Sequence, residues 1–209
     1  MRILYLHGFA SSPQSSKAQF FARKFAERGV AIDIPALDGG DFEHLTITNQ
    51  LKIVERSLGA GPVAMMGSSL GGYLTAIYAE KHPEQVSRVI LLAPAFRFLE
   101  GWRSRFSEQQ LAAWKQGGAM PFYHYGDKTQ RQLSYQLIED AQTYPPEPAF
   151  AQPGLILHGT KDDVVPFSGS EEFAARRQNV QLRSFVSGHE LTDVLEPMWR
   201  EVAAFMKLD

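Results

Sequence analysis

The sequence predicts an α/β fold built on a doubly wound, mostly parallel sheet of about six strands. Two observations predict it. Short apolar segments bounded by Gly, Pro, Asp or Asn alternate with longer amphipathic segments, and several of the short segments contain no polar residue, as is typical of strands buried on both faces. The chain has 209 residues, of which 44% are hydrophobic, and this fits one domain with a full core. We therefore expect residues 1–209 to form a single domain.

The elements of this fold follow one another along the chain. Six short apolar segments are predicted strands: Ile3–Leu6, Ile32–Ile34, Val63–Met66, Val89–Ala93, Leu155–Leu157 and Val180–Val186. Five longer segments carry apolar residues at helical spacing and are predicted helices: Ser16–Arg28, Thr46–Leu58, Leu70–His82, Ser168–Arg177 and Pro197–Lys207. Because a helix follows most strands, neighbouring strands are expected to be parallel.

Residues 96–149 interrupt the alternation and are predicted to be an inserted cap. Ser107 and Gln110 have the spacing of a capping box that opens a helix through Trp114. Two short strands, Phe122–Tyr125 and Arg131–Tyr135, are expected to form a hairpin around Gly126–Asp127. The insertion is rich in aromatic residues, and we expect some of them, with Trp102 and Tyr123 as candidates, to line a substrate pocket. The alternative is that these aromatics only stabilise a small core within the insertion.

Composition excludes several classes of function. The formal net charge is −2 and no basic run is present, so neither a nucleic acid nor a membrane surface is an expected partner. The chain has no cysteine, and its histidines and glycines form no zinc, dinucleotide or P-loop motif, so we expect no metal and no cofactor. Residues 1–7 lack the features of a signal peptide, and we expect a cytoplasmic location. Composition leaves the oligomeric state open.

One motif carries the strongest chemical signal. Gly67-Ser68-Ser69-Leu70-Gly71 joins a predicted strand to a predicted helix, which is the context of a G-x-S-x-G nucleophile elbow. Such a turn projects the serine hydroxyl away from the backbone, and the free amides at the helix start face the site where negative charge develops. Only Ser69 has glycine two residues before it and two after it, which excludes Ser68. Ser69 is therefore the predicted nucleophile.

The loop after the first strand, His7-Gly8-Phe9, is expected to supply an oxyanion donor. The predicted pair of backbone donors is the amides of Phe9 and Leu70. Backbone donors require no particular side chain, so position alone supports this pair. His7 is expected to brace the loop and not to act as a catalytic base.

The remaining reactive groups follow the last two strands. The sequence Ser187-Gly188-His189 places an imidazole after the final strand, where a flexible loop can bring it over the elbow, and His189 is the predicted general base. Either Asp162 or Asp163 can supply the carboxylate that orients it, and the spacing from Gly159 favours Asp162. The other aspartate is then expected to close the turn before Val164. The order Ser, Asp, His along the chain matches that of the elbow-type hydrolases.

Two runs of residues resemble a known family. The start Tyr5-Leu6-His7-Gly8-Phe9 with Ser11-Ser12-Pro13, together with the elbow Gly67 to Tyr73, resembles the YqiA/YcfP-like small bacterial esterases of the α/β-hydrolase superfamily. The resemblance covers residues 1–95 and 154–193. It implies a minimal α/β-hydrolase fold and hydrolysis of carboxylic esters with short acyl groups, with Ser69, Asp162 and His189 at the triad positions.

The sequence thus predicts a serine hydrolase that cleaves small carboxylic esters through an acyl-enzyme. Its expected partner is a small ester or a related acyl compound. Three alternatives use the same triad with another pocket: a thioesterase, an amidase and a carbon–carbon-bond hydrolase. A fourth alternative is a hydrolase-fold binding protein without activity, and the presence of every triad member in the sequence argues against it.

Overall fold

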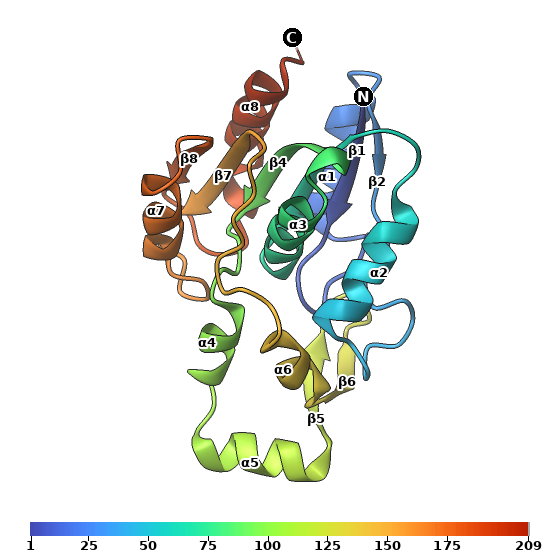
Figure 1. Ribbon diagram of the computed structural model, residues 1–209, viewed down its shortest axis with the longest axis vertical. Helices are drawn as coiled ribbons and strands as arrows, with labels where there is room; N and C mark the ends of the chain where they lie inside the picture. The colour runs from blue at the N-terminus through green and yellow to red at the C-terminus, as the bar shows by residue number, and fades with distance from the viewer. Residues whose placement is uncertain (209) are drawn as a thin grey trace.

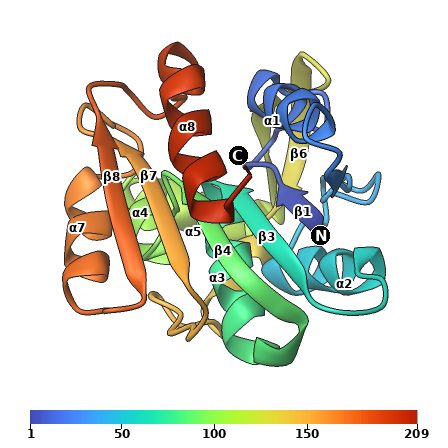
Figure 2. The ribbon, with the colours of Figure 1, turned by 90° about the horizontal axis from the view of Figure 1, so that it is seen from above.

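A computed structural model describes residues 1–208 and contains a parallel sheet of six strands in the order β2-β1-β3-β4-β7-β8 (Figures 1 and 2). The strands are β1 (Arg2–Leu6), β2 (Ala31–Asp33), β3 (Val63–Ser68), β4 (Val86–Leu92), β7 (Gly154–Gly159) and β8 (Val180–Phe185). Every neighbouring pair in this sheet is parallel. The predicted doubly wound sheet is therefore confirmed.

Helices cover both faces of the sheet. Figure 2 shows α1 (Ser16–Ala26) and α8 (Leu195–Met206) on one face, and α2 (Ile47–Ser57) and α3 (Leu70–Lys81) on the other. On that second side, α7 (Phe167–Ala175) packs beside β7 and β8. Apolar side chains of alternate strand positions pack against each helical layer, so the core consists of two clusters separated by the sheet.

The element boundaries differ from the predictions by a few residues, and local chemistry explains the largest shift. Strand β4 begins three residues before the predicted start, because Val86 pairs with Val63 before a register shift in the ladder. The polar residues Ser87 and Arg88 lie in this first part of the strand and conceal it from an apolar pattern. Helix α2 begins after Thr46, whose side chain accepts a hydrogen bond from the Asn49 amide and caps the helix.

The predicted insertion between β4 and β7 forms a cap at the lower end of the molecule in Figure 1. It contains α4 (Phe98–Arg103), α5 (Glu108–Gly117), the hairpin of β5 (Ala119–His124) and β6 (Thr129–Ser134), and α6 (Gln136–Ala141). The capping box of Ser107 and Gln110 is present at the start of α5. Helices α4 and α6 were not expected from the sequence, because six residues are too few to establish a helical period.

Polar contacts attach the cap to the body of the domain. The Tyr125 amide, beyond the end of β5, donates to the carbonyl of Ala10 at 2.7 Å. The Thr48 amide at the start of α2 donates to the Asp140 carboxylate at 2.9 Å, and the Thr48 hydroxyl donates to the same carboxylate. The cap is thus held over the loop that follows β1.

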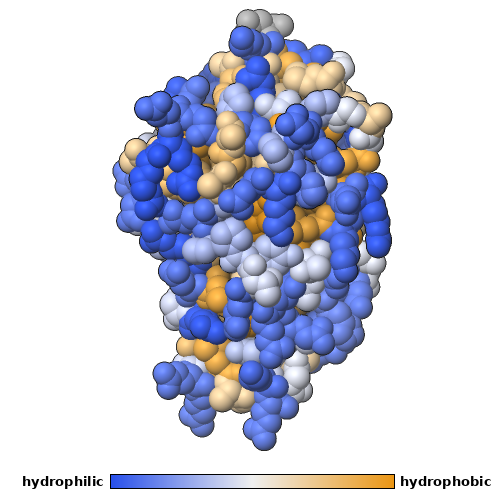
Figure 3. Space-filling view, viewed as in Figure 1, coloured by the Kyte–Doolittle hydropathy of each residue, from blue (hydrophilic) through white to orange (hydrophobic). Residues whose placement is uncertain are grey.

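The outer surface is mainly hydrophilic on the face shown in Figure 3, and apolar residues are exposed at its lower end, where the cap lies. Two short 3-10 helices, η1 (Pro83–Gln85) and η2 (Thr192–Val194), precede β4 and α8. Among residues 1–208, no helix is long and apolar enough to cross a lipid bilayer.

The close approach of α3 to β1 allows a test of the fold. A Cβ atom at Gly71 would lie 2.1 Å from the carbonyl oxygen of Leu6, which is backbone and cannot move aside. We expect Gly71→Ala to lower the free energy of unfolding by more than about 2 kcal/mol. Gly101→Ala is the control, because nothing lies within 4 Å of its Cβ position in α4. A similar effect of both substitutions in urea unfolding would contradict this packing.

Candidate active site

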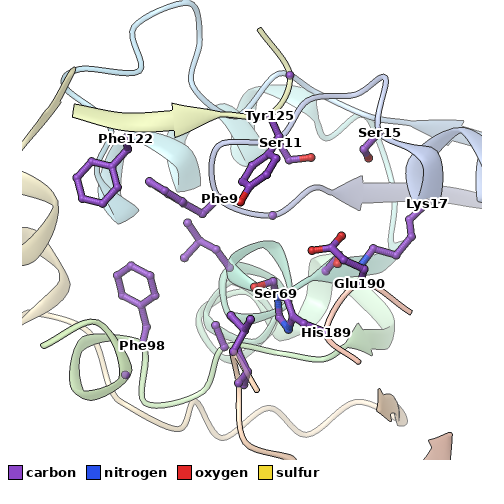
Figure 4. Close-up of a pocket in the computed structure, with 18 of the residues that line it drawn as sticks. Phe9, Ser11, Ser15, Lys17, Ser69, Phe98, Phe122, Tyr125, His189 and Glu190 are labelled. Carbon is purple, nitrogen blue, oxygen red and sulfur yellow. Dashed lines mark hydrogen bonds between the residues drawn. The ribbon is translucent and has the colours of Figure 1, made fainter. Parts of the chain in front are cut away.

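Ser69 occupies a strained turn between β3 and α3. Its φ of 53° and ψ of −117° are unusual for a residue with a side chain, and such strain persists only where the surroundings hold the backbone in place. Two neighbours do so: the Ser69 amide donates to the carbonyl of Leu92 at 2.9 Å, and the Ala95 amide donates to the carbonyl of Ser69 at 3.0 Å. The sharp turn projects the Ser69 hydroxyl into the space beneath the cap (Figure 4).

Glycines make this turn possible because backbone atoms occupy the space of their missing side chains. A Cβ at Gly67 would lie 2.1 Å from the carbonyl oxygen of Gly71, and a Cβ at Gly72 would lie 3.1 Å from Pro94. Close backbone contacts therefore require glycine in the turn around Ser69, as the sequence predicts.

The structure brings Ser69, His189 and Asp162 together from three loops at the carboxyl ends of β3, β8 and β7. His189 Nε2 lies 3.0 Å from Ser69 Oγ, and His189 Nδ1 lies 2.8 Å from Asp162 Oδ2. An ionised carboxylate only accepts, so Nδ1 carries the proton and donates to Asp162. Nε2 is then free to accept the hydrogen bond from the Ser69 hydroxyl.

Asp162 is the aspartate that contacts His189, and it also closes the turn that follows. Its Oδ1 accepts hydrogen bonds from the amides of Val164 at 2.9 Å and Val165 at 2.8 Å. The expectation that the other aspartate would close this turn is wrong, because the two oxygens of one carboxylate serve both purposes. Asp163 is exposed.

The charge of Asp162 is stabilised by these contacts. Burial alone would raise the pKa of this carboxyl group, but hydrogen bonds from His158, His189 and the Val165 amide hold its pKa well below the usual range. The side chain is fully buried. Asp162 is therefore ionised at neutral pH and can stabilise a positive charge on His189.

His158 is a neighbour of Asp162 that the sequence analysis did not assign to the site. It lies in β7, is fully buried, and its Nε2 is 3.0 Å from the same Oδ2 that His189 contacts. Its Nδ1 lies 2.7 Å from the Ser170 hydroxyl. With Ser170 donating to Nδ1, Nε2 carries the proton and donates to Asp162. In the sequence, the position of His158 four residues before Asp162 is the feature that could have indicated this contact.

Backbone hydrogen bonds join the loop of Asp162 to the loop of His189. The Thr160 amide donates to the carbonyl of Phe185 at 2.8 Å, and the Lys161 amide donates to the carbonyl of Ser187 at 3.0 Å. A Cβ at Gly159 would lie 2.3 Å from the Ser187 carbonyl oxygen, so only glycine permits this approach. The pairing of β7 with β8 thus continues beyond the strand ends and sets the distance between the two side chains.

The two residues predicted to supply oxyanion donors, Phe9 and Leu70, both line the cavity over Ser69. Leu70 is the first residue of α3, so its amide has no acceptor within the helix. Gly8 lies against the elbow, since a Cβ at this position would be 3.5 Å from the Ser69 Cβ, and Phe9 follows it in the same loop. Helix α3 also places its positive N-terminal end at Ser69. This arrangement suits a negatively charged oxygen beside the serine.

His7 has a structural environment, as expected. Its Nε2 accepts a hydrogen bond from the Leu37 amide at 3.2 Å, and its Nδ1 lies 3.0 Å from the Gly8 carbonyl, to which it donates. Burial is the main reason that the pKa of His7 is lower than usual. The neutral ring thus ties the loop after β1 to the segment after β2.

A cavity of about 1120 Å³ extends over Ser69 and beneath the cap. Trp102 and Tyr123, the predicted pocket residues, both contribute to its lining. They differ in environment: Trp102 is 7% exposed and packs against Phe9 with ring centroids 4.8 Å apart, whereas Tyr123 is 45% exposed. Trp102 also contacts Trp114 within the cap, so one side chain belongs to both the pocket wall and the cap core.

Comparison with known proteins assigns the chain to a family. The model of the uncharacterised protein family UPF0227 matches residues 2–207. The chain belongs to this family. The match agrees with the resemblance to YqiA-like proteins expected from the sequence.

Relatives of this UPF0227 member carry the names of hydrolases. Palmitoyl-protein thioesterase ABHD10 of Bos taurus is 26% identical over 191 residues, which are 83% of this chain and 61% of that protein. The chain therefore spans about three fifths of the length of this curated relative. The name supports placing the chain among the α/β hydrolases.

Solved structures show the same fold. Mouse alpha/beta hydrolase domain-containing protein 10 superposes with a TM-score of 0.83 at 21% identity, covering 99% of this chain and 89% of that one. Est1E from Butyrivibrio proteoclasticus, with ferulic acid bound, gives 0.84 at 22% identity over 98% and 87%. The predicted α/β-hydrolase fold is confirmed.

The buried, neutral His7 predicts how stability changes with pH. The unfolded chain takes up a proton near pH 6.5, whereas folded His7 binds it only at lower pH. Stability of the UPF0227 protein should therefore fall as the pH drops below about 6.5, with a slope of up to about 1.4 kcal/mol per pH unit from this group.

Urea unfolding of the wild type and of His7→Gln between pH 5 and 9 measures this contribution. The variant should lose less stability than the wild type as the pH falls from 6.5 to 5. Between pH 8 and 9 the difference between the two proteins should stay constant, because the histidine is neutral in both states. Parallel curves over the whole range would contradict a lowered pKa.

Proposed function

We propose that this protein is a serine hydrolase that cleaves carboxylic esters of small acyl groups, with Ser69, His189 and Asp162 as its catalytic triad. The observation that carries the proposal is the chain of two hydrogen bonds from Ser69 through His189 to Asp162. Ser69 and His189 are 120 positions apart in the sequence, and Asp162 and His189 are 27 positions apart. All three lie just beyond the carboxyl ends of the strands, where doubly wound folds bind ligands.

In the first half of the reaction, Ser69 Oγ attacks the carbonyl carbon of the ester. His189 Nε2 accepts the hydroxyl proton as the new bond forms, and the carbonyl π electrons move to the oxygen. The tetrahedral intermediate then collapses, the bond to the leaving group breaks, and His189 donates its proton to the departing oxygen. The products of this step are an acyl-enzyme on Ser69 and a free alcohol.

In the second half, a water molecule repeats the sequence. His189 removes a proton from the water, whose oxygen attacks the acyl carbon, and the proton then passes to Ser69 Oγ as the acid departs. Asp162 keeps its charge throughout. It holds the Nδ1–H tautomer of His189 and stabilises the imidazolium, which its low pKa permits.

The oxyanion of both intermediates is assigned to the amides of Phe9 and Leu70. The free amide at the start of α3 and the positive end of that helix support this assignment. Losing one such donor typically costs about 100- to 1000-fold in rate. Because the donors belong to the backbone, no single side-chain deletion removes them.

A thioesterase is the second candidate, because the alignment with palmitoyl-protein thioesterase ABHD10 covers 83% of this chain. The same triad attacks a thioester carbonyl, with a thiol as the leaving group. Matched oxygen and sulfur esters of one acid, compared by kcat/KM, distinguish the two activities.

Exchange of the triad residues tests the proposed mechanism. Asp162→Asn should lower kcat on a 4-nitrophenyl ester by about 10⁴-fold, since it allows the wrong His189 tautomer. Ser69→Ala removes the nucleophile and should lower kcat by about 10⁶-fold. Ser69→Ala should also abolish labelling by a fluorophosphonate probe, which separates an enzyme from a binding protein of the same fold.

Neighbouring residues of the same type are the controls for these exchanges. Ser68→Ala and Asp163→Asn should keep activity within about threefold of the wild type, because neither side chain contacts His189. Circular dichroism checks that each variant is folded. Near-normal turnover by folded Ser69→Ala would refute the mechanism.

The acyl pocket is assigned to the aromatic lining of the cap. Trp102→Phe should shift the preference toward longer acyl chains by about tenfold in the ratio of kcat/KM values, because one methylene in an apolar pocket is worth about 1–3 kcal/mol. The measurement is a series of 4-nitrophenyl esters from acetate to decanoate.

Trp114→Phe is the matched control, because Trp114 belongs to the same aromatic cluster and does not line the cavity. Its Nε1 donates to the Leu133 carbonyl, so this exchange should lower stability and leave the chain-length profile unchanged. Lowered stability with an unchanged chain-length profile in both variants would assign the cap aromatics to structure alone.

A further inference from the structure

The cavity over Ser69 has two ends of opposite chemistry. Toward the cap its wall is aromatic and includes Phe9, Phe98, Trp102 and Phe122. Toward the start of α1 its wall is polar and includes the serines at positions 11, 12, 15 and 16, together with Lys17 and Glu190. Figure 4 shows Phe98 and Phe122 on one side of Ser69, and Ser15, Lys17 and Glu190 on the other. A substrate that fills both ends has one apolar and one polar part.

Lys17 is the unusual residue of the polar end. Its side chain reaches from α1 into the cavity toward Glu190, yet the residue is only 9% exposed. Within residues 1–208, no carboxylate oxygen lies within 4.0 Å of its Nζ, and its ammonium group forms no hydrogen bond with the protein. In the same part of the chain Gln152 Oε1 is the one fully buried side-chain nitrogen or oxygen without a partner, so Lys17 Nζ is reached by solvent from the cavity. By contrast, Lys24 on the same helix pairs with Glu196 at 2.9 Å.

The stem of Lys17 is buried, whereas its ammonium group opens onto the cavity. Burial is the main reason that the pKa of Lys17 is lower than usual, while the charges of Glu190 and Asp162 act in the opposite direction. Glu190 is exposed to solvent and stays beyond ion-pair distance. Among residues 1–208 the ammonium group thus has no direct ionic partner, and an anionic group of a ligand in the cavity can reach it.

The start of α1 adds further donors. This helix of eleven residues has no acidic side chain in its first turn, and the Ser15 side chain at its N-cap forms no capping hydrogen bond. Ser11 and Ser15 line the same cavity as Lys17. An anion at this position would meet an ammonium group, free hydroxyls and the positive end of a helix dipole.

The position of His189 decides which part of the substrate occupies this end. In the proposed mechanism His189 donates a proton to the leaving group, so the leaving group lies on the His189 side of Ser69. Glu190 follows His189 directly, and Lys17 reaches toward it (Figure 4). The polar end thus receives the leaving group, and the aromatic end receives the acyl group.

We propose that Lys17 binds a carboxylate or phosphate on the leaving group, so that the substrates of this site are esters of an apolar acid with an anionic alcohol or thiol. This inference rests on the proposed hydrolase function and adds the charge of the leaving group to it. Lys17 is the residue that determines this specificity, and the serines at positions 11 and 15 supply additional hydrogen bonds.

Substrates that differ only in charge test the inference. 4-(Butyryloxy)benzoate carries a carboxylate on its leaving group, and 4-(butyryloxy)benzamide is neutral with nearly the same shape. 4-(Butyryloxy)phenyl phosphate tests phosphate in place of carboxylate. The wild type should hydrolyse at least one of the two anions with a kcat/KM at least tenfold above that of the amide, and the preferred anion identifies the group that is bound.

The decisive variant is Lys17→Met, which keeps the length of the side chain and removes its charge. It should lower kcat/KM for the preferred anion by about 10- to 100-fold, mainly through KM, and change hydrolysis of the neutral amide by less than threefold. Lys24→Met is the control with the same loss of net charge, and it should leave the preference for the anion unchanged.

A second variant distinguishes a substrate site from a structural pair with Glu190. If Lys17 only balances the charge of Glu190, then adding Glu190→Gln to Lys17→Met restores the activity that was lost. If Lys17 binds substrate, the double variant stays defective on anions, and Glu190→Gln alone lowers their KM. The Tm of Lys17→Met should equal or exceed that of the wild type, since the exchange removes an unpaired charge that partial burial disfavours.

The outcomes separate this inference from the proposed function. Equal losses on the anions and the amide, restoration by Glu190→Gln, or no preference in the wild type would each overturn the role of Lys17 while leaving a working hydrolase. Binding of 4-hydroxybenzoate and of phenyl phosphate to Ser69→Ala, measured by calorimetry with and without Lys17→Met, requires no turnover. Binding of at least one anion that depends on Lys17 supports the inference even if no ester is cleaved. Binding that does not depend on Lys17 refutes it.

Discussion

The contact between α3 and the end of β1 is the constraint on which the site depends. Gly71 allows the helix backbone to touch the carbonyl of Leu6, and Gly67 allows the turn before it to close. This packing forces Ser69 into its positive φ and aims its hydroxyl at the cavity, while the amide of Leu70 faces the same space. Strain at the reactive residue is thus balanced by burial of the surrounding strands and helix.

A single buried carboxylate organises the other half of the site. Asp162 contacts His189 and His158 through one oxygen and the amides of Val164 and Val165 through the other. A fully satisfied buried acid is rigid as well as charged, because each hydrogen bond would be expensive to leave unmade. The hydrogen bond from His189 Nδ1 to this rigid carboxylate fixes the orientation of the imidazole ring, and Nε2 stays directed at the Ser69 hydroxyl.

The cavity shows how function and stability oppose each other in this domain. Its aromatic end adds to stability, since Trp102 and Phe122 pack together with ring centroids 5.5 Å apart while they line the pocket. Its polar end works against stability, because the surroundings disfavour the charge of Lys17 and no carboxylate among residues 1–208 pairs with it. The cap therefore belongs to the folded core, and the start of α1 is the place where the domain gives up stability for binding.

The sequence by itself predicted the order of the six sheet strands, the elbow at Ser69 and His189 as its base, and it favoured Asp162 over Asp163, because local spacing and strand–turn–helix order are properties of neighbouring residues. It also located the cap, from the break in this alternation. Only the tertiary structure decided that Asp162 closes its own turn, that His158 shares its oxygen, and that Lys17 lies unpaired in the cavity. The first two facts depend on the exact backbone path of one loop, and the third depends on how α1 packs against the cavity; neither leaves a periodic pattern in the chain.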